Sequence, residues 1–258
     1  MNNDTVLKLS IGGIMGVAES LFGGNMFESL KIMRQHNNKY IDSVKILYAR
    51  NGIRSLLYTG YYPYGIFQSI SKGVPFFYAS ITTKEYLEKK NLSKDLVSIG
   101  SGFSGGFAQG FFIAPTQRLK TLSIINNNPN HNLYEILKKE KINDLFRGSF
   151  LLSIRRSLDW SLRLLVMNKL NKKNTESSII VSSFIGGTMG VITLPIDVLV
   201  SRYQSSKYPI TLLIKKIIKE EGIKTFTNGL TMRIFYSGWH TFWVAGIGTI
   251  IYQKIKEN

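Results

Sequence analysis

Acidic, amide and basic side chains recur at fixed offsets after three apolar stretches of the chain. With Met26, Pro115 and Pro195 as reference positions, the residues two places further on are Glu28, Gln117 and Asp197, and those five places further on are Lys31, Lys120 and Val200. Carboxylate and ammonium groups placed in this way can form ion pairs between neighbouring segments. In nonpolar surroundings a broken pair is costly, so such a set is expected to be complete or to lack whole pairs.

A second group of charges lies inside an otherwise apolar stretch, residues 149–170. It comprises Arg155, Arg156, Asp159, Arg163 and Lys169. Ionisable groups within a membrane segment are costly and usually functional, and guanidinium groups bind phosphate and carboxylate through two parallel hydrogen bonds. Asp159 can neutralise an arginine four residues away, and the remaining cations predict a site for an anion. Arg163 and Lys169 lie near the end of the stretch and fit snorkelling toward the membrane surface equally well.

The composition indicates anionic partners. The 258 residues include 33 Lys and Arg against 16 Asp and Glu, a formal net charge of +17, which is typical of proteins that meet nucleic acid, phospholipid head groups or small anions. The hydrophobic content and the 23 glycines favour membrane helices over nucleic-acid binding. The sequence has no Cys, and its three His show no metal-ligand spacing, so we expect no metal and no cofactor. The N-terminus resembles neither a signal peptide nor a transit helix, so any targeting information is expected to be internal.

Six weakly charged stretches are each long enough to cross a bilayer as a helix. They are residues 9–27, 61–83, 96–117, 149–170, 177–194 and 234–253. Basic, Asn-rich joints separate them. Glycines four residues apart mark the odd-numbered stretches, namely Gly12 and Gly16, then Gly102, Gly106 and Gly110, then Gly186 and Gly190. This spacing puts them on one helix face, where neighbouring helices can approach closely.

The chain is a tandem of three related units, each with a long helix, a short amphipathic helix and a second long helix. Gly60, Gly148 and Gly229 follow the short helices and lie 34, 33 and 34 residues after the three reference positions. We place the units at residues 1–92, 93–174 and 175–258. Pro115 and Pro195 are expected to kink the first long helix of their units. The first unit has Met26 instead, so its helix is expected to bend less, or to bend at Gly23–Gly24.

The repeated pattern of Pro, acid, base and Gln, followed by "EGIKTFTNG" or its equivalents and a second helix, resembles the mitochondrial carrier family. The resemblance covers essentially the whole chain; it is strongest in the third unit and weakest in the first. It implies an all-α membrane protein, with six transmembrane helices around a pseudo-threefold axis and three short surface helices on the matrix side. It further implies a multi-pass monomer of the mitochondrial inner membrane that transports by alternating access and is not an enzyme. Membrane lipid, cardiolipin included, is an expected partner at the N-termini of the short helices, and nucleic acid is not.

The resemblance also assigns a matrix gate. In the family, the acid of each unit pairs with the base of the next. On this chain the rule gives the pairs Glu28–Lys120 and Asp197–Lys31 and sets Gln117 against Val200. Under this rule two ion pairs remain, and the two gate positions without a charge, Gln117 and Val200, face each other. Pairing in the opposite direction would leave Glu28 and Lys31 without partners of opposite charge. The gate of the opposite face has no recognisable motif, and its nearest trace is "YQKIK" at Tyr252.

The substrate site implied by the resemblance lies at the centre of the cavity, where Arg155 stands seven residues after Gly148. The expected substrate-binding residues are Gln68, Lys72, Arg155, Arg156, Asp159, Arg233 and Tyr236. Several cations with aromatic neighbours slightly favour a nucleotide or another phosphorylated compound, whereas Arg155–Arg156 at the contact position is more typical of carriers of keto or dicarboxylic acids. A carrier-fold membrane scaffold that does not transport is the rival class. Glu19 is a further cavity candidate whose role in proton coupling stays open, and His240 is interpreted as a packed residue.

Overall fold

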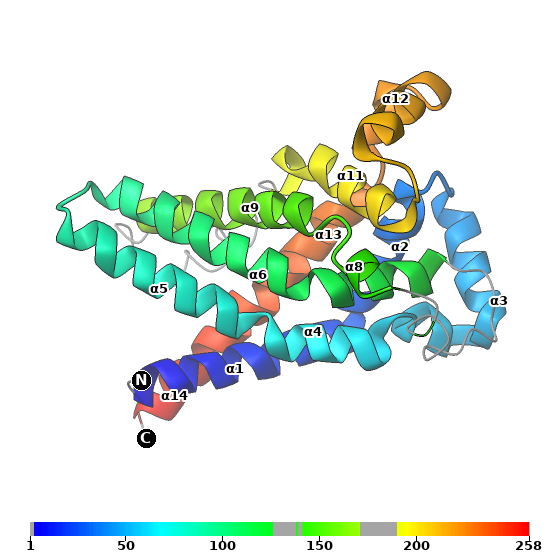
Figure 1. The fold of residues 1–258 in the computed structure, drawn as a ribbon. Helices are drawn as coiled ribbons and strands as arrows, with labels where there is room; N and C mark the ends of the chain where they lie inside the picture. The colour runs from blue at the N-terminus through cyan, green and yellow to red at the C-terminus, as the bar shows by residue number, and fades with distance from the viewer. Residues whose placement is uncertain (1–2, 126–137, 139–140, 171–189, 258) are drawn as a thin grey trace.

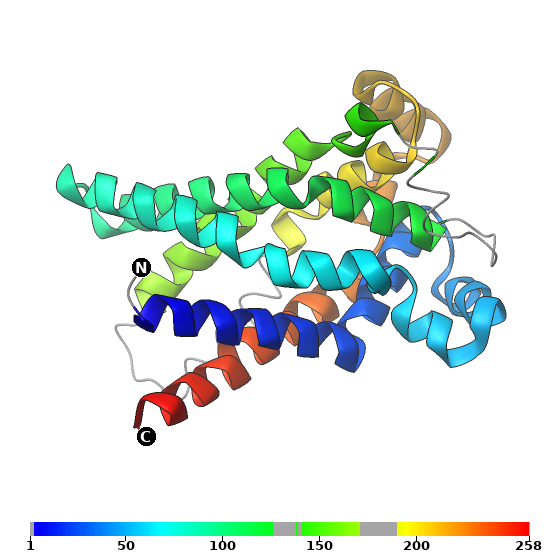
Figure 2. The ribbon, with the colours of Figure 1, turned by 60° about the horizontal axis from the view of Figure 1, so that its bottom comes forward.

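The computed structural model describes residues 3–125, 138, 141–170 and 190–257. Within these ranges all regular structure is helical and no strand occurs, which confirms the all-α fold class. Figures 1 and 2 show long helices that run obliquely past one another, with both chain termini at the same end of the molecule.

The first unit consists of helices separated by sharp breaks. Along the chain these are α1 (Asn3–Glu19), η1 (Ser20–Gly24), α2 (Asn25–Gln35), α3 (Tyr40–Tyr58), η2 (Tyr61–Gly65), α4 (Ile66–Ser71) and α5 (Gly73–Lys89). Between α1 and α2 the backbone leaves the helical region at Phe22 and Gly23, and the φ angle of Gly23 is 116°. Glycine adopts such an angle at little cost. The first long helix therefore bends at Gly23, one of the two outcomes expected where Met26 replaces proline.

The second unit is dominated by two long helices, which lie close together in Figure 1 and cross obliquely in Figure 2. Its helices are α6 (Lys94–Ile125), α8 (Ile142–Leu145) and α9 (Ser149–Leu170). A β-carbon on Gly102 would lie 2.7 Å from the Cα of Ser161, and one on Gly110 2.5 Å from the Cα of Ser153, so the glycine face of α6 touches the backbone of α9. The expected close approach is thus found here. It is not found at Gly12, where a β-carbon would meet nothing within 4 Å.

The third unit begins, in the described part of the chain, just before Pro195. Its helices are α11 (Leu194–Ser205), α12 (Ile210–Glu220), η3 (Ile223–Thr227), α13 (Leu230–Thr241), η4 (Phe242–Ile247) and α14 (Gly248–Glu257). The helix is interrupted at Thr193, two residues before Pro195, whereas α6 continues through Pro115 as one helix. Most of the fifth apolar stretch, with Gly186, lies outside the described residues.

Three equivalent glycines show how the units meet. Gly60, Gly148 and Gly229 each precede a second long helix and have φ angles of 71°, 82° and 89°. A β-carbon added at these glycines would lie 3.1, 3.2 and 3.3 Å from side-chain atoms of Lys120, Gln204 and Lys31, respectively. Each glycine therefore abuts the first long helix of the following unit, and the third unit abuts the first. This cyclic arrangement encloses a central cavity.

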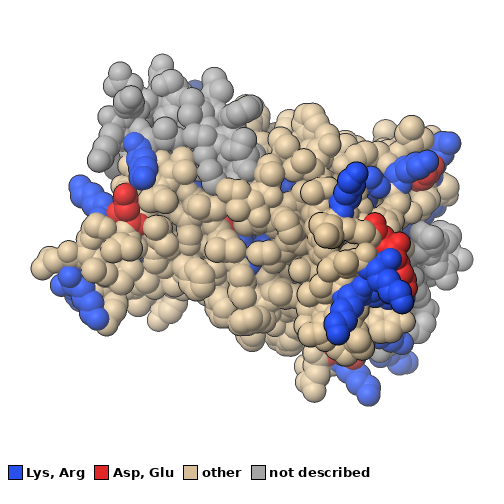
Figure 3. All heavy atoms as spheres, turned by 90° about the horizontal axis from the view of Figure 1, so that it is seen from above, with Lys and Arg blue, Asp and Glu red and all other residues tan. Residues whose placement is uncertain are grey.

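One described helix, α6, is long and apolar enough to cross a membrane by length and composition. Of the other predicted spans that the structure describes, three are interrupted, near Gly23, at Lys72 and in η4, and the fourth, α9, carries several charges. In Figure 3 the charged side chains gather at the two ends of the molecule, and a broad, largely uncharged band separates them. The helices are compatible with six spans, and that number stays a prediction.

Candidate functional site

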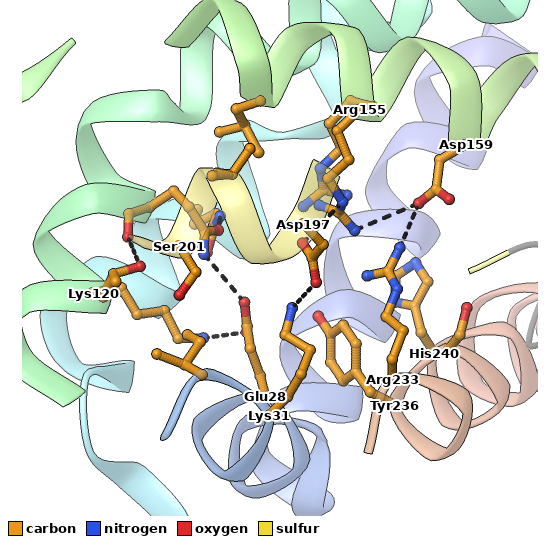
Figure 4. Close-up of a pocket in the computed structure, with 18 of the residues that line it drawn as sticks. Glu28, Lys31, Lys120, Arg155, Asp159, Asp197, Ser201, Arg233, Tyr236 and His240 are labelled. Atoms are coloured by element: carbon orange, nitrogen blue, oxygen red, sulfur yellow. Dashed lines mark hydrogen bonds and ion pairs between the residues drawn. The ribbon is translucent and has the colours of Figure 1, made fainter. Parts of the chain in front are cut away.

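One end of the central cavity is closed by ion pairs between units. Lys120 Nζ on α6 lies 2.6 Å from Glu28 Oε2 on α2, and Lys31 Nζ on α2 lies 2.8 Å from Asp197 Oδ2 on α11. The pairing rule set these residues against each other, and the structure brings them together (Figure 4). We call these four residues the floor of the cavity. All four are buried, so breaking either pair would leave a charge without a partner in nonpolar surroundings.

Asp197 is the centre of a larger polar network. Its Oδ2 accepts a second hydrogen bond, from Gln35 Nε2 at 3.0 Å. Arg155 Nε on α9 lies 3.0 Å from Asp197 Oδ1, within ion-pair distance but not aligned as a hydrogen bond. The sequence predicted Arg155 as a substrate contact, and the spacing carried no sign of its contact with the gate acid. Arg155 therefore connects the floor to the cavity above it.

The third pair of gate positions, Gln117 and Val200, forms no ion pair. Gln117 Nε2 lies 3.4 Å from Glu28 Oε1, and Gln117 Oε1 accepts a hydrogen bond from Gln68 Nε2 at 2.5 Å. Val200 belongs to an apolar cluster with Ile113, Ala114 and Leu152. Gln117 and Val200, which the pairing rule set against each other, thus belong to different clusters: Gln117 to a polar one and Val200 to an apolar one. Gln68, expected to contact substrate, supports the floor through Gln117.

In the layer above the floor, Asp159 forms ion pairs with arginines from two units. Arg233 Nη2 on α13 donates to Asp159 Oδ2 at 2.9 Å, and Arg155 Nη2 lies 3.6 Å from the same oxygen. Thr193 Oγ1 donates to Asp159 Oδ1 at 3.0 Å. The spacing of four residues predicted a neighbour on the same helix, but the shortest ion pair comes from Arg233, which is 74 positions away in sequence.

Two cations of the cavity have no acid at ion-pair distance among the described residues. They are Arg156 on α9 and Lys72, which stands between α4 and α5. In the described part of the chain the cavity is lined by seven Lys and Arg and three Asp and Glu, so its net charge is positive. Its free space of about 70 Å³ accommodates several water molecules. An anion that enters this cavity therefore finds cations whose charge is not already neutralised.

The aromatic residues of the cavity have neighbours of their own. The ring of Trp160 packs against Phe76 with centroids 4.2 Å apart, Arg163 lies 5.8 Å from its centroid, and its Nε1 donates to Gln109 at 2.9 Å. The ring of Tyr236 stacks with that of His240 at 6.3 Å. These contacts leave less ring surface for a bound base than the sequence suggested.

Two expectations concern the end of the molecule away from the floor. Lys169 is exposed and lies 4.0 Å from the exposed Asp95, as snorkelling to the surface requires. Tyr252 stands in α14, but its side chain lies outside the described part of the structure. The second gate therefore stays a prediction.

His36, in the region beyond the floor, makes the stability of the folded protein depend on pH. It follows the last residue of α2, outside the apolar spans; its Nδ1 donates to the Ile32 carbonyl and its Nε2 accepts from Ser205 Oγ, both at 2.9 Å. Burial, reinforced by nearby Arg202, lowers the pKa of His36 from 6.5 to about 4. The unfolded chain therefore binds this proton near pH 6.5, and the folded chain binds it only near pH 4.

We expect acidification from pH 7 to pH 4.5 to lower the free energy of unfolding by roughly 2.5 kcal/mol through His36 alone. The sign is destabilising because, between the two pKa values, the unfolded state binds the extra proton. Thermal unfolding of the detergent-solubilised protein at the two pH values measures the effect. His36→Gln should reduce the difference between them, and an unchanged difference would contradict the prediction.

Comparison with known proteins finds several chains of similar sequence. A family model described as mitochondrial carrier protein matches residues 171–257. The citrate/oxoglutarate carrier protein of Saccharomyces cerevisiae is 24% identical, with 97% of this chain and 90% of that protein covered. The mitochondrial substrate carrier family protein S of Dictyostelium discoideum is 26% identical over 92% of this chain and 93% of that protein. The mitochondrial glycine transporter of Vanderwaltozyma polyspora is 26% identical over 65% of this chain, which spans only 62% of that transporter.

Proposed function

Because this chain belongs to the mitochondrial carrier family, we propose that it carries a di- or tricarboxylate across the mitochondrial inner membrane by alternating access. The observation behind this proposal is the net positive cavity with Arg156 and Lys72 lacking acidic partners among the described residues. Cations in such a site are costly unless an anion pairs with them or water solvates them. A carboxylate can accept two parallel hydrogen bonds from the Arg156 guanidinium.

Carboxylates fit the site better than the nucleotide that the sequence slightly favoured. The compared relatives are named for glycine, for citrate and oxoglutarate and, in a tricarboxylate transport protein of Saccharomyces cerevisiae that is 28% identical over 48% of this chain, for tricarboxylates. The ring of Trp160, which could have stacked on a base, already packs on Phe76. The nucleotide remains as an outcome of the transport test.

Alternating access requires a floor that closes and opens. In the proposed cycle the pairs Glu28–Lys120 and Lys31–Asp197 close the matrix side while the cavity is open to the other side. Arg155 contacts both Asp197 and Asp159, so its position ties the floor to the layer where the anion binds. A movement of side chains in either layer should therefore shift Arg155 and, through it, the other layer.

Exchange in liposomes tests the proposal. The purified protein is reconstituted into liposomes loaded with citrate, 2-oxoglutarate, glycine, ADP or phosphate, and uptake of the labelled compound is measured. Rapid exchange of citrate or 2-oxoglutarate supports a carboxylate carrier. Exchange of ADP alone would move the assignment to nucleotides, and no exchange of any compound would favour the non-transporting scaffold.

We expect Arg156→Ala and Lys72→Ala each to raise the apparent KM for the transported carboxylate about tenfold or more, because each removes a charge-assisted hydrogen bond worth about 1.5–3 kcal/mol. The initial rate of exchange at increasing substrate concentration gives this value. The matched controls are Arg54→Ala and Lys84→Ala, which remove exposed cations outside the cavity. An unchanged KM in both cavity variants would exclude these residues from the substrate site.

A further inference from the structure

A buried acid lies beside the cavity with few hydrogen-bond partners among the described residues. Glu19, the last residue of α1, is 0% exposed. Its Oε2 lies 3.4 Å from His240 Nδ1 on α13 and 3.4 Å from Ser20 Oγ. Its Oε1 has no hydrogen-bond partner among the described residues. A carboxylate can accept about four hydrogen bonds and, when buried, normally receives several, so these surroundings suit a carboxyl group that gains and loses a proton.

The bend of the first long helix makes room for this carboxyl group. A β-carbon on Gly24 would overlap with Glu19 Oε1, so only glycine leaves the space that the side chain occupies. The backbone at the same point is held by Trp239, whose Nε1 donates to the Glu19 carbonyl at 3.2 Å. Glu19 is thus held in a defined pocket between α1 and α13.

His240 connects this pocket to the cavity. Its side chain is 19% exposed, whereas that of Glu19 is 0% exposed, and it lines the cavity next to Arg233 and Tyr236 (Figure 4). An imidazole both donates and accepts protons near neutral pH. Water in the cavity can therefore exchange a proton with His240, and His240 can pass it to Glu19.

The charges around the pair link its protonation to the presence of an anion. Besides His240, the titratable groups that act on Glu19 are Lys72, Glu28 and Tyr61, and those that act on His240 include Lys72 and Arg163. No Lys or Arg among the described residues lies within ion-pair distance of Glu19, and Lys72 is the nearby cation whose positive charge acts on it. An anion bound to Lys72 offsets that positive charge and so favours protonation of Glu19. By reciprocity, protonation of Glu19 favours binding of the anion.

We propose that Glu19 and His240 form a proton site that carries one proton across the membrane with each substrate anion. The unloaded site is a Glu19 carboxylate beside a neutral imidazole. It takes one proton from water in the cavity through His240, holds it between Nδ1 and Oε2, and returns it to water on the other side when the cavity has opened there. Only O–H and N–H bonds form and break. This inference rests on the proposed function.

Net uptake driven by a pH gradient tests the inference separately from transport itself. Liposomes without internal substrate are given labelled 2-oxoglutarate, with the membrane potential clamped to zero and the outside one pH unit more acidic. One unit of pH corresponds to 1.36 kcal/mol per proton, so coupling to one proton predicts about tenfold accumulation of the anion. A pH-sensitive dye inside the liposomes should report proton entry at the same time. Exchange at equal pH on both sides reports the proposed function alone.

The Glu19→Gln variant keeps the size of the side chain and removes its titration. We expect it to exchange 2-oxoglutarate at equal pH but to lose the tenfold accumulation, as should His240→Gln. The control Glu88→Gln replaces an exposed carboxylate on α5 and should behave as the original protein does. The inference is overturned if the original protein exchanges the anion without accumulating it under the gradient, or if Glu19→Gln still accumulates it tenfold. If the original protein does not exchange at all, the proposed function fails instead.

Discussion

Exchange by the Glu28→Lys variant is expected to fall about a hundredfold or more, and the double variant Glu28→Lys/Lys120→Glu should recover to within about tenfold of the original rate. In the single variant two ammonium groups face each other in a buried floor, and breaking such a pair costs about 3–5 kcal/mol. A cost of 3 kcal/mol on the closed state corresponds to more than a hundredfold in rate. Initial rates of exchange in liposomes measure both effects.

The neighbours of this pair allow the reversal. Gln117 donates to Glu28 in the structure, and an amide can turn to offer its oxygen to a lysine at the same place. The other pair provides the contrast, because Arg155 lies 3.0 Å from Asp197. A lysine at position 197 would face that guanidinium, so Lys31→Asp/Asp197→Lys should stay inactive. Equal recovery of both double variants, or recovery of neither, would contradict this account of the floor.

A second large effect is expected where α6 meets α9, because a methyl group on Gly106 has no space. A β-carbon there would overlap with the carbonyl oxygen of Arg156, and backbone atoms cannot move aside as a flexible side chain can. We expect Gly106→Ala to lower the free energy of unfolding by about 3 kcal/mol, the upper range for overpacking. Denaturant or thermal unfolding in detergent gives the value.

The matched control is Gly13→Ala in α1, where the new methyl group would meet nothing within 4 Å. At that position alanine should stabilise the helix by up to about 1 kcal/mol, because it loses less backbone entropy than glycine. The same substitution is thus expected to have opposite signs at the two sites. Equal effects would mean that helix propensity, and not the contact with α9, decides the outcome at Gly106.

The part of the site that depends on repetition could be predicted from the sequence. Glu28, Lys120, Lys31 and Asp197 occupy equivalent positions of the three units, so a rule about neighbouring units sufficed to pair them. The all-α fold followed from apolar length, and a bend at Gly23–Gly24 was one of the two outcomes expected where proline was missing.

Contacts that break the repetition could not be predicted. Gln117 bonds to Glu28 and Gln68 because an amide can donate and accept at once, and its choice depends on which side chains three different helices bring within 3.5 Å. Arg155 lies on Asp197 for a similar reason. Glu19 and His240 lie 221 positions apart in sequence and occupy no equivalent positions. Only the folded chain shows that they meet.

The apolar contact of Val200 with Ile113 and Leu152 has a thermodynamic consequence for the closed state. Two of the three gate pairs depend on charge, whereas the Val200 contact depends on the removal of hydrocarbon from water. Such burial changes the heat capacity, and its strength fades on cooling. In the proposed transport cycle, the balance between the inward-open and outward-open conformations should therefore follow a curved van 't Hoff plot, with the apolar contact of Val200 the first to loosen in the cold.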